Sequence, residues 1–360
     1  MAIEKISTEQ LLLLAKQYPV LDVRSPGEYI HAQIPGAHSL PLFTDEERKI
    51  IGTAYKKQSR DIAIKLGLDF FGVKMKKMVE EVEKTVSGYG LRVSEQTRNL
   101  PETRNSVIVH CWRGGMRSSA VAWLLNFYGY NVYLLEGGYK AYRNWVLQQF
   151  EKDYDLNIIG GYTGSGKTGL LKTLQEKKYP VIDLEGFANH KGSAFGALGQ
   201  PLQPTQEMFE NLLATALHQN SKNTCWIEDE SQRIGSLNIP HGFWNIMRTK
   251  PVFFIDIPFE QRLDHITENY GSFEKESLIE ATERIKKRLG PNEAKTAIAF
   301  FKTGQDKEAF RILLGYYDKS YLKALNKREN LPALLNKIDC LGVDAISNTE
   351  KLISCAIVNT

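Results

Sequence analysis

Cysteine is scarce in this sequence, and no long apolar run occurs in it. Four cysteines are spread over 360 residues, with no CxxC pair and no metal-like spacing to the seven histidines. A chain of this length does not need disulfides, so we expect a reducing, cytoplasmic location and no structural metal. No apolar stretch approaches the roughly 20 residues that cross a bilayer, and LLLLA at 11–15 has only five. We therefore expect no membrane partner and no signal peptide.

A strong excess of charge of either sign is also lacking. The formal net charge is +4, with 24% charged and 42% hydrophobic residues. This balance neither requires nor excludes a nucleic-acid partner, and it leaves enough apolar residues for a sizeable core. At roughly 100–200 residues per domain, the length predicts two domains. Because the pattern of strands and helices restarts near residue 150, we expect domains over 1–150 and 151–360.

Short apolar strands alternate with helical segments in both halves. In the first half we expect strands within 19–25, 106–111 and 131–138, and helices within 53–90 and 118–129. In the second half we expect strands within 156–161, 180–186, 224–230 and 251–258, a helix over 166–178 and a mainly helical segment over 260–327. Strands between helices predict parallel sheets covered on both faces. The expected fold class is α/β, with two parallel-sheet domains and a helical C-terminal part.

The stretch VIVHCWRGGMRSSA (107–120) places Cys111 between an apolar strand and the start of a helix. Glycines let the amides of such a loop point inward as an anion-binding nest, and the helix N-terminus adds positive potential. Together with nearby arginines, these effects favour the thiolate, which is the nucleophilic form of cysteine. Cys111 is the candidate catalytic residue, and the candidate active-loop residues are Arg113, Gly114, Gly115, Arg117 and Ser118. The alternative is a buried cysteine beside surface arginines.

A second candidate loop, GYTGSGKT at 161–168, has the spacing G-x-x-x-x-G-K-[ST] between a strand and a helix. In this arrangement backbone amides face phosphate oxygens, lysine adds charge, and the Thr168 hydroxyl can contact magnesium. The expected phosphate-binding residues are Gly161, Gly164, Ser165, Gly166, Lys167 and Thr168. In the acidic segment 228–230, Asp229 is the expected magnesium contact, although a solvated strand end would look the same. The motif predicts phosphate binding and does not decide between ATP, GTP and another phosphate ligand.

The first half resembles the rhodanese family. The resemblance rests on LDVRSPGEY (21–29), IPGAHSLPL (34–42), CWRGGMRSS (111–119) and LEGGYKAYRNW (135–145), which occur in the order of that family's motifs. It implies a rhodanese-like domain over about 1–150, with a transferable sulfur or selenium atom carried on Cys111. Asp22 and Arg24 would be structural residues near the site.

Nearly the whole chain resembles the tRNA 2-selenouridine synthase family. To the motifs above, the resemblance adds LFTDEERKIIGTAYKKQ (42–58), DLEGFANHKGSAFG (183–196) and EDESQRIGSLNIP (228–240). It implies a transferase that acts on 2-thiouridine at the wobble position of the tRNA anticodon. The sulfur is first geranylated from geranyl diphosphate, and selenium from selenophosphate then replaces the S-geranyl group. Ala54 stands where relatives can carry a second cysteine, which weakens any mechanism that needs two thiols.

A tRNA partner requires a basic surface. The candidate tRNA contacts are Arg284, Lys286, Lys287 and Arg288 in one predicted helix, and Lys74, Lys76 and Lys77 form a second basic run. A solvated helix face is an equally good explanation of each run. The aromatic segment 314–325 is expected to pack more than to stack on bases. The loop with His190, Lys191 and Ser193 is expected near the phosphate site, because the strand before it should end at the same edge of the sheet. The alternative is a loop that only wraps a helix end.

Three other functions are compatible with parts of the sequence. The first is a P-loop kinase or ATPase with a rhodanese-like sulfurtransferase or regulatory module. The second is a sulfurtransferase that uses the P-loop domain only for docking. The third is a phosphatase-like rhodanese relative, which is disfavoured because Trp112 directly after the cysteine would crowd a pocket for a phosphate ester. The number of subunits is left open by the sequence.

Overall fold

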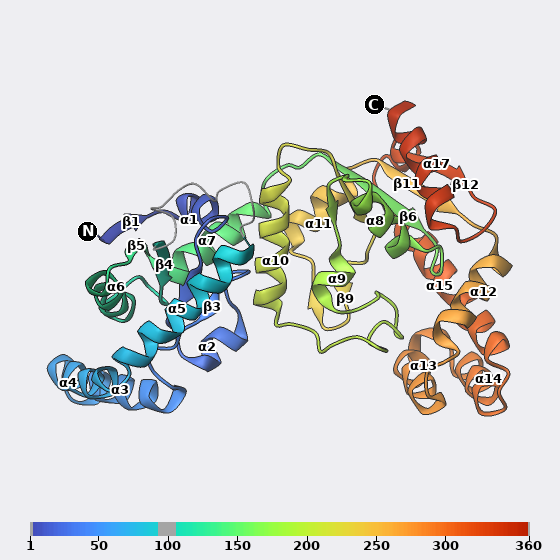
Figure 1. The fold of residues 1–360 in the computed structure, drawn as a ribbon. Helices are drawn as coiled ribbons and strands as arrows, with labels where there is room; N and C mark the ends of the chain where they lie inside the picture. Colours follow the sequence, from blue (N-terminus) through green and yellow to red (C-terminus); the bar gives the residue numbers. More distant parts are fainter. Residues whose placement is uncertain (1–2, 93–105, 359–360) are drawn as a thin grey trace. The chain divides into compact units, whose positions relative to one another are not determined.

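The chain folds into two compact units, residues 1–148 and 149–360. The computed structural model describes residues 3–92 and 106–358 (Figure 1). Each unit is built around a five-stranded parallel sheet, which confirms the predicted α/β class. Within the described residues, no helix combines the length and the apolar character needed to cross a membrane.

The sheet of the N-terminal unit has the strand order β1-β5-β4-β2-β3. Its strands are β1 (Ile3–Ile6), β2 (Val20–Asp22), β3 (His38–Ser39), β4 (Ser106–His110) and β5 (Asn131–Leu135). Every residue of β4 is buried, as expected for a central strand covered on both faces. The short loop that follows β4 therefore begins at the carboxyl end of a fully packed strand.

Seven helices lie in the N-terminal unit as it is described. They are α1 (Thr8–Leu14), α2 (Pro26–His31), α3 (Asp45–Lys57), α4 (Arg60–Gly72), α5 (Met75–Arg92), α6 (Met116–Tyr128) and α7 (Gly138–Gln149), whose last residue already belongs to the second unit. Helix α1 begins with a capping box formed by Ser7 and Gln10. The long helical region expected over 53–90 is divided among three helices, since Ser59 starts a new helix by accepting a hydrogen bond from the amide of Ile62.

The sheet of the C-terminal unit has the order β12-β11-β6-β8-β7, and all of its strand pairs are parallel. The strands of this unit are β6 (Leu156–Gly161), β7 (Val181–Ile182), β8 (Cys225–Glu228), β11 (Val252–Asp256) and β12 (Leu335–Asp339), and a separate hairpin is formed by β9 (Arg233–Ile234) and β10 (Leu237–Asn238). The strand β6 lies in the middle, where connections leave towards both edges. Ligands of open parallel sheets bind at such a switch point, beyond the carboxyl ends of the strands.

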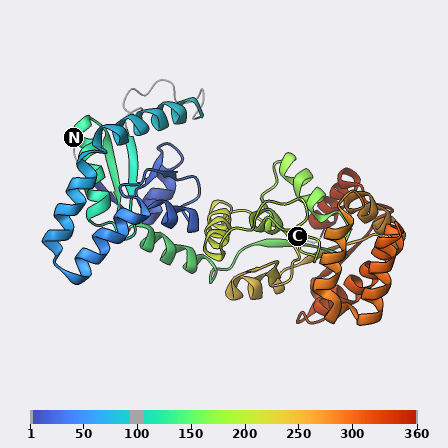
Figure 2. The ribbon, with the colours of Figure 1, turned by 90° about the horizontal axis from the view of Figure 1, so that it is seen from below.

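The helices of the C-terminal unit form two groups. The group around the sheet consists of α8 (Lys167–Glu176), α9 (Leu184–Ala188), α10 (Gln206–Gln219), α11 (His241–Arg248), α16 (Leu331–Leu334) and α17 (Ala345–Val358). The other group is the predicted helical part, with α12 (Phe259–Tyr270), α13 (Lys275–Leu289), α14 (Pro291–Lys302) and α15 (Asp306–Leu325) side by side in Figures 1 and 2. This second group has its own apolar core, to which Phe195 of the loop after α9 also contributes.

Candidate active site

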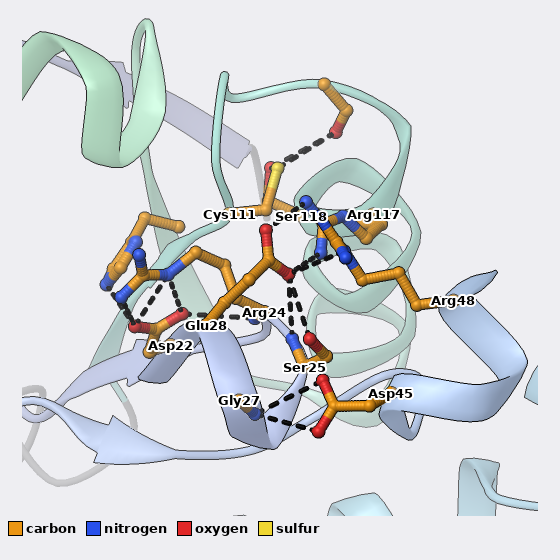
Figure 3. A network of polar contacts seen from close by, with 12 residues as sticks. Asp22, Arg24, Ser25, Gly27, Glu28, Asp45, Arg48, Cys111, Arg117 and Ser118 are labelled. Carbon is orange, nitrogen blue, oxygen red and sulfur yellow. Dashed lines mark hydrogen bonds and ion pairs between the residues drawn. The ribbon is translucent and has the colours of Figure 1, made fainter. Parts of the chain in front are cut away.

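Cys111 directly follows β4 and lies at the base of the loop that leads into α6 (Figure 3). Its side chain is buried, with 3% of its surface exposed. The sulfur lies 3.1 Å from the hydroxyl oxygen of Ser118 in the first turn of α6, and Ser118 also donates to the carbonyl of Gly115 at 3.1 Å. The strand end and the helix start therefore hold the thiol from two sides.

The double-glycine segment 137–138 closes against this loop. A Cβ atom on Gly138 would lie 2.3 Å from the carbonyl oxygen of Cys111, and one on Gly114 would lie 2.8 Å from the carbonyl oxygen of Leu135. Both glycines also have positive φ, which L-residues rarely adopt. The amide of Tyr139 then donates to the Cys111 carbonyl at 2.8 Å. Glycine is required at both positions because two backbone segments approach each other too closely for side chains.

The two arginines of the loop have different environments. Arg117 donates to Glu28 at 2.7 Å, and Arg48 pairs with the same carboxylate at 3.0 Å (Figure 3). Burial raises the pKa of Glu28, but the hydrogen bond and charge of Arg117 outweigh this effect, so the pKa lies below its usual value. Arg113 is exposed. Thus Arg117 joins α6 to α2 and α3, whereas Arg113 presents its charge to solvent beside the loop.

Asp22 and Arg24 form a fully buried ion pair at the end of β2, with a contact of 2.6 Å. The Arg24 guanidinium also donates to the carbonyl of Ala32 and lies 3.8 Å above the ring centre of Tyr139. The neighbouring ring of His110 is fully buried, and burial lowers its pKa, so it is neutral. These contacts support the expected structural role of Asp22 and Arg24, because both brace the strands behind Cys111.

The phosphate-loop motif occupies the predicted place between β6 and α8. Gly161, Gly164 and Gly166 have φ of +150°, +81° and +77°, and a Cβ atom on any of them would lie 2.6–2.7 Å from a neighbouring side chain. The Lys167 ammonium donates to the carbonyl of Gly161 at 3.1 Å. Ser165 is buried, and its hydroxyl has no hydrogen-bond partner among the described residues. The glycines thus allow a tight loop with Lys167 folded across it.

Three carboxyl groups lie next to this loop. The Thr168 hydroxyl donates to Glu185 at 3.1 Å, and Glu185 also shares a hydrogen bond with Glu230. Glu228 is fully buried and accepts from the backbone amide of Glu185 at 2.8 Å, while its second oxygen has no partner among the described residues. Burial, followed by the charge of Glu185, raises the pKa of Glu230 to about 8. Near neutral pH, Glu230 is therefore the proton donor of this carboxyl pair.

Asp229, the expected magnesium contact, has other partners. One of its oxygens forms an ion pair with Arg328, and the other accepts a hydrogen bond of 2.8 Å from the Tyr321 hydroxyl. Successive side chains of an extended segment alternate in direction, so Asp229 faces away from the side shared by Glu228 and Glu230. The structure therefore favours Glu185, Glu228 and Glu230 over Asp229 as carboxyl groups for the phosphate site.

The same residues fit a magnesium ion. Thr168 and the neighbouring carboxyl groups supply the hard oxygen ligands that magnesium prefers. In the described part of the chain, no cluster of three or more acidic, histidine or cysteine side chains has metal-binding geometry. That finding is compatible with the usual magnesium–phosphate arrangement, in which one or two protein oxygens act with phosphate oxygens and water.

The candidate tRNA contacts lie together on α13, where Arg284, Lys286, Lys287 and Arg288 are all exposed. Two of them have protein partners, since Arg284 donates to the carbonyl of Ala194 and Lys286 pairs with Glu283. The second basic run lies at α5 and its approach. There Lys74, Lys76 and Lys77 each pair with a glutamate of the same unit.

The loop after α9 and the position of Ala54 are the other features considered from the sequence. The amide of Ala194, in the loop after α9, donates a hydrogen bond to the Tyr317 hydroxyl oxygen at 3.0 Å, and Ser193 hydrogen bonds to Tyr270. This loop reaches the phosphate site, because Gly192 lies against Glu185 and Glu230. Ala54 is buried in α3, and Cys111 is the one cysteine in the sequence of the N-terminal unit.

Comparison with known proteins accounts for both units. The sequence model described as the tRNA 2-selenouridine synthase AAA domain matches residues 154–339, and that of the rhodanese-like domain matches residues 7–144. The tRNA 2-selenouridine synthase of Hydrogenovibrio crunogenus is 33% identical over 351 residues, which cover 88% of this chain and 92% of the relative. That of Bdellovibrio bacteriovorus is 37% identical over 282 residues, with 75% of this chain and 69% of the relative covered.

A solved structure is similar to part of the chain. It is the N-terminal domain of a protein from Clostridium difficile 630 that is described as ATP/GTP-binding. That domain is 36% identical, covers 41% of this chain and 99% of its own length, and has a TM-score of 0.33.

Fold and loops define a class of protein in which a rhodanese-like domain precedes a P-loop-type domain. Within that class, the chain belongs to the tRNA 2-selenouridine synthase family of tRNA-modifying enzymes. The resemblance seen in the sequence motifs is thereby confirmed.

Proposed function

We propose that this protein converts the wobble 2-thiouridine of tRNA to 2-selenouridine in two steps. The C-terminal unit first transfers a geranyl group from geranyl diphosphate to the sulfur of the base. Selenium from selenophosphate then replaces the S-geranyl group, which leaves as geranyl thiol, while one water is taken up and phosphate is released. Selenium stays at the selenide level, so no oxidant is needed, and Cys111 is the proposed nucleophile of the N-terminal unit. The proposal rests mainly on one observation: a glycine-framed, buried cysteine and a phosphate loop flanked by carboxyl groups occur in one member of this family.

The phosphate loop suits a diphosphate leaving group. The loop amides and Lys167 would bind the phosphate oxygens, after the Lys167 ammonium leaves the Gly161 carbonyl. Thr168 and Glu185 would hold magnesium, which supplies positive charge where the leaving group gains negative charge. Glu230 would keep Glu185 oriented by donating a hydrogen bond to that carboxylate. Nucleotide hydrolysis is not needed for this chemistry.

The cysteine loop suits transfer of a soft atom. The Ser118 hydroxyl lies 3.1 Å from the sulfur, and the start of α6 contributes positive potential to a thiolate there. Arg113 would add charge for the selenophosphate anion, while Arg117 keeps the helix in place through Glu28. Since Cys111 is the only thiol in the sequence of this unit, the proposed step uses a single cysteine. The predicted cytoplasmic location is compatible with a tRNA substrate.

Mass spectrometry of tRNA nucleosides tests this proposal against its rivals. Thiolated tRNA is incubated with the purified protein and geranyl diphosphate, selenophosphate, both, or ATP alone. We expect S-geranylated 2-thiouridine with geranyl diphosphate and 2-selenouridine with both substrates. ATP turnover without either product would favour the kinase or ATPase, and sulfur transfer without geranylation would favour the sulfurtransferase.

A further inference from the structure

A buried tyrosine of α15 touches the first glycine of the phosphate loop. The amide of Gly161 donates to the Tyr321 hydroxyl at 3.2 Å, and this hydroxyl donates to Asp229 at 2.8 Å. Burial, followed by the charge of Asp229, raises the pKa of Tyr321 well above its usual value. The phenol therefore keeps its proton and can accept one hydrogen bond while donating the other.

The sequence around Gly161 makes room for this contact. A Cβ atom on Gly160 would lie 3.0 Å from the Tyr321 hydroxyl and 2.8 Å from a methyl group of Val252, so glycine is needed here although its own φ is not positive. On its carbonyl side, Gly161 accepts the hydrogen bond of Lys167. The position of Gly161 therefore determines where the Lys167 ammonium lies before phosphate binds.

Two further contacts fix α15 to the same loop. Arg328, just beyond the helix, forms the ion pair that orients Asp229 towards Tyr321. One turn before Tyr321, Asp318 binds Arg262 through contacts of 2.9 and 2.7 Å, and Arg262 donates to the Thr163 carbonyl at 3.0 Å. The helix therefore holds the loop at residue 161 directly and at residue 163 through an arginine.

We propose that Tyr321 is a positioning residue for the phosphate loop, and that α15 sets the loop geometry in which a diphosphate is bound. The inference depends on the proposed function for the identity of the substrate. It depends on the contacts of Gly161, Asp229 and Thr163 for the position of the loop.

Magnesium pyrophosphate binding to the full-length Tyr321→Phe protein tests this inference by calorimetry. The substitution removes one oxygen atom and leaves the Asp229–Arg328 pair intact. We expect binding to weaken about 5- to 10-fold, as for the loss of one hydrogen bond. Tyr154→Phe is the matched control, because it removes a buried hydroxyl that donates to the Gln149 carbonyl at the opposite end of β6. The control should bind pyrophosphate like the wild type.

Kinetics and hydrogen exchange separate positioning from general destabilisation. For geranylation, Tyr321→Phe should raise the KM for geranyl diphosphate, while selenation of previously geranylated tRNA keeps its wild-type rate. Amide exchange at residues 160–167 should accelerate in Tyr321→Phe and not in Tyr154→Phe. Unchanged pyrophosphate binding and unchanged exchange in Tyr321→Phe would overturn the inference, and equal losses in both variants would reduce it to a stability effect.

The outcome for the wild type separates this inference from the proposed function. If the wild type binds ATP and not pyrophosphate, the geranyl diphosphate chemistry is wrong, and the same ratio between variant and wild type is measured with ATP. If it binds neither, both proposals are overturned. Should Tyr321→Phe fold poorly, Asp318→Asn tests the second attachment in the same assay, with the same expected weakening.

Discussion

The two units place their candidate loops at the same topological position and surround them with different side chains. In each unit, a buried central strand ends in a glycine-rich loop that leads into a helix. Behind the Cys111 loop, the cations Arg24 and Arg117 are neutralised by Asp22 and Glu28. Beside the phosphate loop, three carboxyl groups lie near one lysine, and Glu230 among them keeps its proton near neutral pH. In the proposed function, the neighbouring side chains, more than the loop backbone, would adapt one such loop to sulfur chemistry and the other to metal-bound phosphate.

The largest effect is expected when the nucleophile of the N-terminal loop is removed. Cys111→Ser should lower the rate of selenation by at least about 10³-fold, because a hydroxyl replaces the soft thiolate. Geranylated tRNA should accumulate, which nucleoside mass spectrometry detects. Cys355→Ser, in α17, is the control and should keep both activities. Selenouridine formation by Cys111→Ser at the control rate would refute the role of this thiol.

A smaller but still large loss is expected at the phosphate loop. Lys167→Ala should slow geranylation by about 10²–10³-fold, since a charge aimed at the leaving group is lost. Unmodified thiolated tRNA should remain in the nucleoside assay. Lys172→Ala changes an exposed lysine on the same helix and should have little effect. A wild-type geranylation rate for Lys167→Ala would contradict the comparison between the loops.

The buried ion pair between Asp229 and Arg328, next to the phosphate loop, tests the comparison through the stability of the C-terminal unit. Asp229→Ala should lower the free energy of unfolding of the C-terminal unit by about 3–5 kcal/mol, because it leaves the buried Arg328 guanidinium unpaired. Asp153→Ala breaks an exposed pair with Lys250 and should cost no more than about 1 kcal/mol. Urea denaturation measures both. Similar costs for the two variants would show that the Asp229 pair is not an important support.

The smallest effect is a pH dependence confined to the N-terminal unit. The pKa of His110 is lowered by burial in the folded state, so below about pH 6.5 the unfolded chain binds the extra proton. Stability should therefore fall as the pH drops below this value, by up to about 1.4 kcal/mol per pH unit. Amide exchange of β4 at pH 7.5 and 5.5, corrected for intrinsic rates, measures this slope. His110→Gln should flatten it, and an unchanged slope would assign the effect to another group.

Both loops and the α/β class could be predicted because their signals are local. Cys111 and Lys167 lie in short motifs whose spacing fixes a strand, a loop and a helix. The strand β12 was not predicted, since its sequence LNKID has few apolar residues and forms an edge strand.

The contacts around the phosphate loop could be predicted only in part. Tyr321 lies 160 positions from Gly161 in sequence, and nothing local marks its hydroxyl as the partner of that amide. Glu185 is likewise recognised only when β7 and β8 are seen side by side. For Asp229 a signal existed, because strand alternation separates it from Glu228 and Glu230. The two-residue alternation of side chains along a strand could therefore have guided the choice of magnesium contact among these three acidic residues.

The central claim, that each unit carries one of the two reactions, is tested most directly with previously geranylated tRNA. This substrate, supplied with selenophosphate, bypasses the phosphate loop. We predict that Lys167→Ala forms 2-selenouridine at the wild-type rate, whereas Cys111→Ser leaves the geranylated nucleoside unchanged. The opposite pattern, with an active Cys111→Ser and an inactive Lys167→Ala, would contradict the account.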